Sequence, residues 1–129
     1  MNMICNRVII LSLLLCCSCM NVENRGQADA WKKVGVDLSN VDQEGLRGPA
    51  DGKVAVSYEF CIPDTSEHRA AVQAIDPTVQ FMPGSRGRIG ASKGQCLCIG
   101  STHQKDYKAV LRSLAKLPYI ERIIECYFE

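Results

Sequence analysis

The sequence predicts an α+β domain over residues 53–129, with its strands and helices in the order β-α-β-β-α-β. Three observations lead to this prediction. Residues 53–62 alternate between two faces, as a half-buried strand does. Residues 105–117 repeat apolar positions at helical spacing. Proline or glycine-rich stretches separate each such segment from the next, and a chain of 129 residues suits a single domain.

The first strand and the first helix are expected over residues 53–62 and 66–75. The strand, KVAVSYEFCI, has one apolar face formed by Val54, Val56, Tyr58 and Phe60. Pro63 ends it, and the polar residues that follow provide an N-cap for a helix with Ala71, Val72 and Ile75 on one side. Asp76 stands before Pro77 and ends this helix, because the residue before proline avoids helical backbone angles.

Three more strands and one more helix complete the predicted domain. The second strand covers residues 78–82, TVQFM, and the third covers residues 95–102, QCLCIGST. The second helix is expected over residues 105–117, and its apolar stripe consists of Tyr107, Val110, Leu111, Leu114 and Leu117. Pro118 ends this helix, and residues 119–129 form the last strand.

This order of elements is that of the split βαβ, or ferredoxin-like, fold. It predicts a four-stranded antiparallel sheet with strand order 4-1-3-2, in which the first and third strands are central. Right-handed crossovers place both helices on one face of the sheet. The other face is then open.

Residues 1–19 have the features of an export signal. Arg7 precedes an apolar run over residues 8–15, which is too short to cross a bilayer as a finished helix. The run ends in Leu-Leu-Leu-Cys-Cys-Ser-Cys, which resembles the lipobox of bacterial lipoproteins, with Ser18 as the small residue before Cys19. Cys16 stands where that family usually carries leucine, so Cys17 is the alternative cleavage point.

The resemblance implies that Cys19 becomes a lipidated N-terminus and that the chain is held at a membrane of the cell envelope. An ordinary cleaved signal without lipid is the alternative. Residues 20–52 are rich in turn-forming and polar residues, which predicts a flexible tether that holds the domain clear of the bilayer. Once Arg7 is removed with the signal, 14 Lys and Arg balance 14 Asp and Glu, so bulk charge gives no argument for an anionic membrane surface, and no nucleic-acid partner is expected.

The glycine-rich segment GSRGRIGASKG, residues 84–94, joins the second and third strands. Backbone N–H groups at such turns can form concave anion sites, and Arg86, Arg88 and Lys93 add positive charge. With His103, they are the candidates for binding an anionic ligand or an acidic partner. The alternative is a hairpin tip in which glycines supply the turns and the cations keep a strand edge soluble.

Four cysteines fall in the predicted domain, and no disulfide is expected among them. Cys126 is expected to face the helices with Ile120 and Ile124, away from Cys61, Cys96 and Cys98. The last three should share the open sheet face with Glu59, close to His103, which makes them weak zinc candidates. The favoured interpretation is small apolar side chains in a sheet, with no metal and no cofactor.

These observations favour a non-catalytic, lipid-anchored envelope protein that binds a protein partner or an anionic ligand. Two alternatives remain open. The ending LAKLPYIERIIECYFE resembles the last helix and strand of subtilisin-type propeptide inhibitors, which cover their protease with the open sheet face. The other alternative is a small thiol or metal protein, although no nucleophile, base and acid are grouped in the sequence to make it an enzyme.

Overall fold

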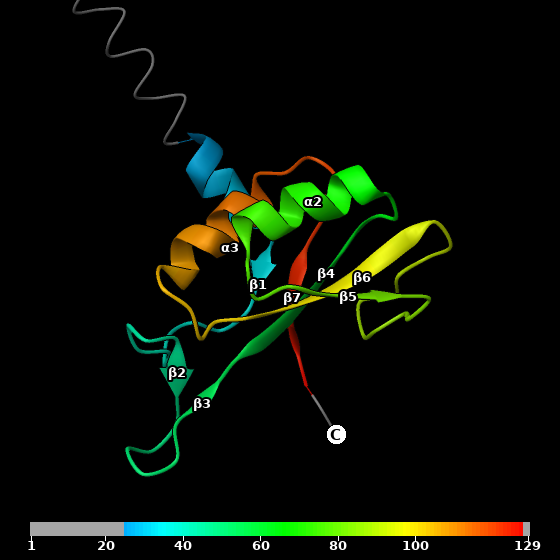
Figure 1. Ribbon diagram of the computed structural model, residues 1–129. Coiled ribbons are helices and arrows are strands. Elements are labelled where there is room, and N and C mark those ends of the chain that lie inside the picture. The colour runs from blue at the N-terminus through cyan, green and yellow to red at the C-terminus, as the bar shows by residue number, and fades with distance from the viewer. Residues whose placement is uncertain (1–24, 128–129) are drawn as a thin grey trace, which may run out of the picture.

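The computed structural model describes residues 25–127 (Figure 1), so the predicted signal peptide and Cys19 lie outside the described part. Helical residues 25–31 come first. The elements that follow are β1 (Val34–Gly35), β2 (Leu46–Arg47), β3 (Val54–Ala55), β4 (Ser57–Pro63), α2 (Ser66–Ile75), β5 (Gln80–Pro83), β6 (Gln95–Ser101), α3 (Tyr107–Ala115) and β7 (Ile123–Cys126).

The main sheet has five strands in the order β1-β7-β4-β6-β5, and β2 pairs with β3 in a separate two-stranded sheet. β1 runs parallel to β7, whereas the other neighbours are antiparallel. The predicted four-stranded antiparallel sheet with order 4-1-3-2 is therefore wrong. Its error arises from β1, a strand of two residues, which is too short to show an alternating pattern in the sequence.

The tether predicted over residues 20–52 also needs correction in the part that the structure describes. Ala30, Val36 and Val41 are buried in the hydrophobic core. Lys33 fixes the segment to the far end of the chain: its Nζ donates to the carbonyl oxygen of Ile120 at 2.8 Å, and its own carbonyl accepts from the Ile123 amide at 2.8 Å. Residues 25–52 are thus part of the folded body.

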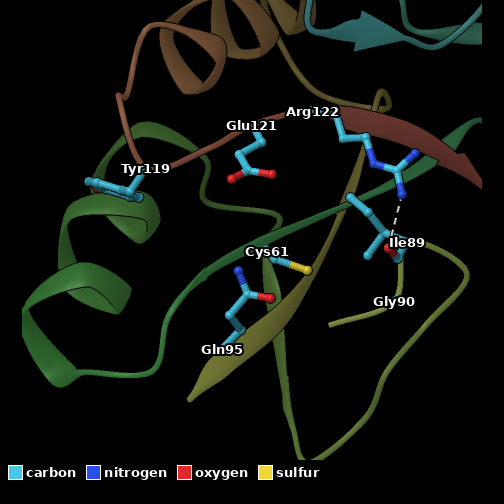
Figure 2. Close-up of a pocket in the computed structure, with 7 residues that line it drawn as sticks. All are labelled: Cys61, Ile89, Gly90, Gln95, Tyr119, Glu121 and Arg122. Carbon is cyan, nitrogen blue, oxygen red and sulfur yellow. Dashed lines mark hydrogen bonds between the residues drawn. The ribbon is translucent and has the colours of Figure 1, made fainter. Parts of the chain in front are cut away.

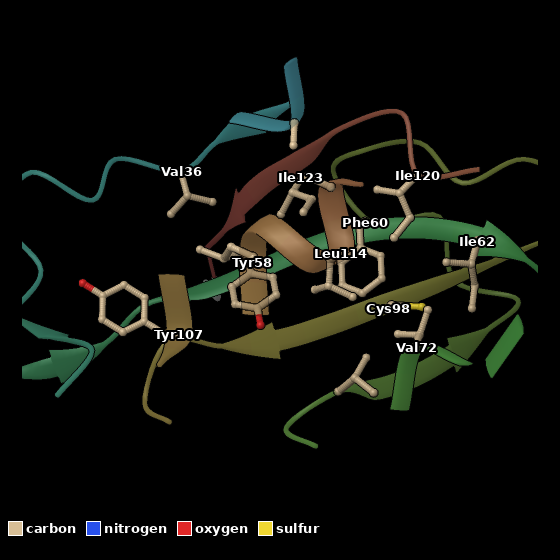
Figure 3. Close-up of a cluster of buried hydrophobic side chains, with 14 of the residues drawn as sticks. Val36, Tyr58, Phe60, Ile62, Val72, Cys98, Tyr107, Leu114, Ile120 and Ile123 are labelled. Atoms are coloured by element: carbon tan, nitrogen blue, oxygen red, sulfur yellow. The ribbon is translucent and has the colours of Figure 1, made fainter. Parts of the chain in front are cut away.

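The core lies between one face of the sheet and the helices (Figures 1 and 3). Tyr58, Phe60 and Ile62 of β4 point into it and are fully buried. The helices supply Val72, Leu111 and Leu114, also fully buried. Among residues 25–127, no helix has both the length and the apolar character needed to span a bilayer.

α2 has the bounds predicted from the sequence, and its ends show why. Thr65 caps its start, because Oγ1 accepts from the His68 amide at 3.1 Å. Asp76 ends it and is fully buried. Its carboxylate accepts hydrogen bonds from the Tyr58 hydroxyl, from Thr78 Oγ1 at 2.6 Å and from Gln104 Nε2 at 3.1 Å. Burial, reinforced by the Asp76 carboxylate, raises the pKa of Tyr58, so the tyrosine remains a donor.

Candidate functional site

The glycine-rich loop over residues 84–94 folds across the sheet face that carries no helices, and we call it the flap. The Ile89 amide donates to Glu59 Oε1 at 2.7 Å, and Glu59 is only 2% exposed. Arg122 Nη2 donates to the Ile89 carbonyl oxygen at 3.0 Å. Gly87, with φ of +59°, lies so close to the sheet that a Cβ would be 2.8 Å from the Leu97 methyl groups. The loop is therefore a cover, rather than a free hairpin tip.

The flap is also closed on itself. The Arg86 carbonyl oxygen accepts from the Ala91 amide at 2.7 Å, which forms an internal turn. Ser92 donates from both its amide and its hydroxyl to Gln95 Oε1, at 2.9 Å each. The Asp64 amide donates to the Gly94 carbonyl oxygen at 2.9 Å and joins the flap to the end of β4. A loop held at so many points is largely ordered before any ligand arrives.

A small hollow separates the flap from the sheet (Figure 2). Its volume is about 120 Å³, well below the ~300 Å³ at which substrate pockets usually begin. Figure 2 shows the Arg122 side chain reaching the flap at Ile89, while Glu121 and the Cys61 thiol face the hollow. The hollow is lined by Cys61, Ile89, Gly90, Gln95, Tyr119, Glu121 and Arg122.

The thiols on this face are poorly suited to chemistry. Burial raises the pKa of Cys61, the Glu59 carboxylate raises it further, and Arg122 opposes both effects. Burial and Glu59 likewise raise the pKa of Cys126. Thiols with raised pKa values stay protonated at neutral pH, and it is the thiolate that attacks substrates and binds metals.

The weak zinc candidates do not come together. In the antiparallel register, Cys98 pairs with Phe60 and Cys96 pairs with Ile62, so both thiols face the helices and are buried. Cys61 pairs with Leu97 and faces the flap. The prediction of one shared face for the three cysteines is wrong because directly paired residues of neighbouring strands point the same way. Residues 25–127 contain no group of three His, Cys, Asp or Glu side chains that could hold a metal ion.

Cys126 also lies on a different face from the one predicted. It pairs with Ser57, so it shares the flap side of the sheet with Glu59 and Cys61. Cys61 is four positions further along β4 than Ser57, a separation of about 13 Å, whereas disulfide formation requires Cα atoms within about 7 Å. The four cysteines of the described residues are free thiols.

The outer side of the flap brings two of the predicted cations together. Arg86 and Lys93 line an open hollow of about 540 Å³. Asp64 also lines it, but its carboxylate is already paired with Arg69. Both cations are exposed, and within residues 25–127 neither forms an ion pair.

The other two predicted binding residues lie elsewhere. Arg88 is placed over the ring of Tyr127, 5.0 Å from its centroid, in a cation–π contact. His103 follows the opposite end of β6, where its Nδ1 is 3.2 Å from the Glu44 carbonyl oxygen. The seven residues of β6 put about 20 Å between that end and the flap. His103 is therefore not part of this site.

Glu59 and Arg122 hold the flap, and reasoning from the sequence gave neither of them this role. No Asp or Glu occurs between Asp76 and Asp106, so a carboxylate that holds the flap must come from elsewhere in the chain, and this was the one sequence signal that pointed toward an acid such as Glu59. Arg122 carries no comparable signal, because its contact with Ile89 joins residues 33 positions apart through the tertiary fold alone.

Comparison of the chain with protein-family models, with curated proteins and with solved structures gives no match. The arrangement of the residues is thus the basis for a functional conclusion. It combines protonated thiols and an inner hollow of about 120 Å³ with two exposed cations that line an outer hollow of about 540 Å³ on a clamped loop. The two cations offer positive charge to an anionic group.

Proposed function

We propose that the chain is a non-catalytic binding module, lipid-anchored in the cell envelope, and that its flap binds an anionic ligand or an acidic partner protein. The observation that carries the proposal is the clamped flap, which presents Arg86 and Lys93 without ion-pair partners among residues 25–127. The lipobox-like segment ending at Cys19 supports export and anchoring.

In this proposal, the anion is bound by side chains of the flap and not by its backbone amides. The Ile89 amide already donates to Glu59, so an internal carboxylate occupies the place on the flap that an external anion would otherwise take. Arg86 offers a planar, bidentate group for a carboxylate or phosphate, and Lys93 adds a mobile point charge. Because the flap is ordered in advance, little conformational entropy is lost on binding.

Binding is tested with a fluorescent oligoglutamate peptide as the probe. The double variant Arg86→Gln/Lys93→Gln should weaken binding by about tenfold, because it removes both exposed cations of the outer hollow. The matched control Arg25→Gln/Lys105→Gln removes the same charge from exposed positions outside the flap and outside α3, and should bind as the parent does. Equal weakening in both variants would show that net charge alone determines the binding of the probe, and it would refute the flap as the binding element.

Anchoring is tested by mass spectrometry of the N-terminal peptide of the membrane-bound protein. We expect an acylated peptide that begins at Cys19, no acylation in Cys19→Ala, and normal acylation in Cys17→Ala. An unmodified N-terminus in the parent chain would refute the anchor and leave the binding test untouched.

The two alternatives receive less support. Propeptide inhibitors use their open sheet face, but here the flap covers that face and buries Glu59 and Leu97. A thiol or metal protein needs accessible thiolates, whereas the pKa values of Cys61 and Cys126 are raised.

A further inference from the structure

The outer face of α3 carries a stripe of cations, which we call the basic stripe: Lys108, Arg112 and Lys116. They are four residues apart along the helix and therefore lie on one side of it. Lys108 and Lys116 are exposed and Arg112 is half-exposed, whereas the opposite side of the helix is buried. No Asp or Glu occurs between Asp106 and Glu121. Asp42 and the N-cap residue Asp106 line a hollow together with Lys108 and Arg112, but Asp42 is paired with Lys53, and among residues 25–127 no acid forms an ion pair with the stripe.

The basic stripe lies beside the place where the folded body meets its N-terminal segment. A shallow hollow is lined jointly by helical residues 25–31 and by the end of α3, including Gly26 and Lys116. In Figure 1 the helix over residues 25–31 lies beside α3, in agreement with the hollow that they line together. Lys33 fixes this corner by donating to the Leu117 and Ile120 carbonyl oxygens.

The distance from helical residues 25–31 to the proposed anchor at Cys19 is short. Only residues 20–24 separate Cys19 from helical residues 25–31, and five residues span at most about 18 Å when fully extended. The nine residues of α3 add about 14 Å along the helix axis. Every cation of the basic stripe is therefore within reach of the membrane surface in which Cys19 would be held.

We infer that the basic stripe rests on anionic phospholipid headgroups, an inference that depends on the proposed lipidation of Cys19. Each cation near an anionic bilayer favours contact by roughly fivefold, so three cations together favour the stripe-down orientation by roughly a hundredfold. The attraction extends only about 10 Å at 0.1 M salt, a range that the short connection to Cys19 helps the body to reach. The flap, on the other side of the sheet from α3, then faces away from the membrane.

The inference is tested on the full lipidated protein, reconstituted into vesicles of phosphatidylcholine alone or with phosphatidylglycerol. A water-soluble amine-acylating reagent is added, and the labelling rate of each lysine is read by mass spectrometry. On anionic vesicles, labelling of Lys105, Lys108 and Lys116 should slow by about tenfold or more, and 0.5 M salt should restore it. Lys93, on the flap, is the internal control and should label equally on both kinds of vesicle.

A triple variant, Lys108→Gln/Arg112→Gln/Lys116→Gln, should restore fast labelling of Lys105 on anionic vesicles. The matched triple variant Arg86→Gln/Arg88→Gln/Lys93→Gln loses the same charge on the flap and should keep Lys105 protected. These substitutions are on exposed or half-exposed side chains, so both variants are expected to fold.

Two results would overturn the inference and leave the anchor standing. One is an acylated protein that floats with vesicles but labels equally on both lipids. The other is protection that appears only when oligoglutamate is added, which would assign the basic stripe to an acidic protein. A chain with no acyl group on Cys19 would overturn the inference together with the proposed anchor.

Discussion

At the scale of single residues, the key pair is Glu59 and Gly87. A carboxylate that is 2% exposed needs hydrogen-bond donors, and the flap supplies one through the Ile89 amide. That approach is possible only because residue 87 has no side chain and its φ is +59°. The glycines and cations of this loop stand out in the sequence, but the acid beneath it comes from a strand about 30 residues earlier.

Gly87→Ala tests this close approach. A Cβ there would lie 2.8 Å from the Leu97 methyl groups and 2.9 Å from Glu59 Oε2, so either these side chains or the flap must shift. We expect a loss of unfolding free energy about 1–3 kcal/mol greater than that of Gly84→Ala. Gly84 is the matched control, because its φ is +79° but a Cβ would meet nothing within 4 Å. Equal losses in urea titrations of the two variants would mean that backbone strain alone matters and that the contact does not.

At the scale of elements, the sequence predicts best where local chemistry marks both ends. α2 matches its prediction because Thr65 caps the start and Asp76-Pro77 ends it, and both signals lie within the segment. The last strand was predicted over residues 119–129, but β7 covers only Ile123–Cys126. Ile120 lies in the loop before the strand, so it does not belong to the strand's alternating pattern. An alternation that starts at Ile120 places every residue of the strand on the wrong face, and it assigned Ile124 instead of Ile123 to the core.

β6 could not be oriented from the sequence for a different reason. Both of its sides are apolar or sulfur-bearing, since Cys96 and Cys98 alternate with Leu97 and Ile99. A pattern with two apolar faces does not say which one meets the helices. Pairing with β4 decides it, because Phe60 faces the core and Cys98 lies opposite Phe60.

The attachment of β1 gives a second prediction at this scale. Lys33→Met removes the Nζ donor to the Leu117 and Ile120 carbonyl oxygens and should lower the unfolding free energy by about 1–2 kcal/mol. Lys32→Met is the matched control: Lys32 is exposed and, within the described residues 25–127, pairs with Asp29 alone, so its loss should stay within about 0.5 kcal/mol. Limited proteolysis within residues 25–33 should be faster in Lys33→Met alone. Similar cleavage of both variants would contradict the assigned role of Lys33.

At the scale of the whole molecule, the layered arrangement buries cysteine thiols and so shifts the pH at which they ionise. Helices cover one face of the sheet and the flap covers the other (Figure 1), and the strand register places thiols on both sides. Burial raises the pKa of each of the four cysteines in residues 25–127 above its ordinary value. In the unfolded chain, these thiols ionise near pH 8.5.

Stability should therefore fall in alkaline solution. A group with a raised pKa in the folded state keeps its proton while the unfolded chain loses it, so its contribution is complete below about pH 8.5 and declines above that value. For fully buried Cys98 the slope approaches about 1.4 kcal/mol per pH unit once the pH is well above 8.5. Urea titrations in reductant between pH 7 and 10 measure it, and Cys98→Ala should be less stable at pH 7 but show a shallower decline. An equally steep decline in both proteins would exclude Cys98 as a source.

Val34 of β1 pairs with Ile123 of β7. β1, the strand nearest the proposed anchor, therefore cannot join the sheet until β7 is present. For a polypeptide threaded through a membrane from its amino end, as export requires, the first strand emerges long before its neighbour exists on that side. If the chain is exported as proposed, the sheet cannot be completed during transit, and folding would finish only after β7 has crossed the membrane.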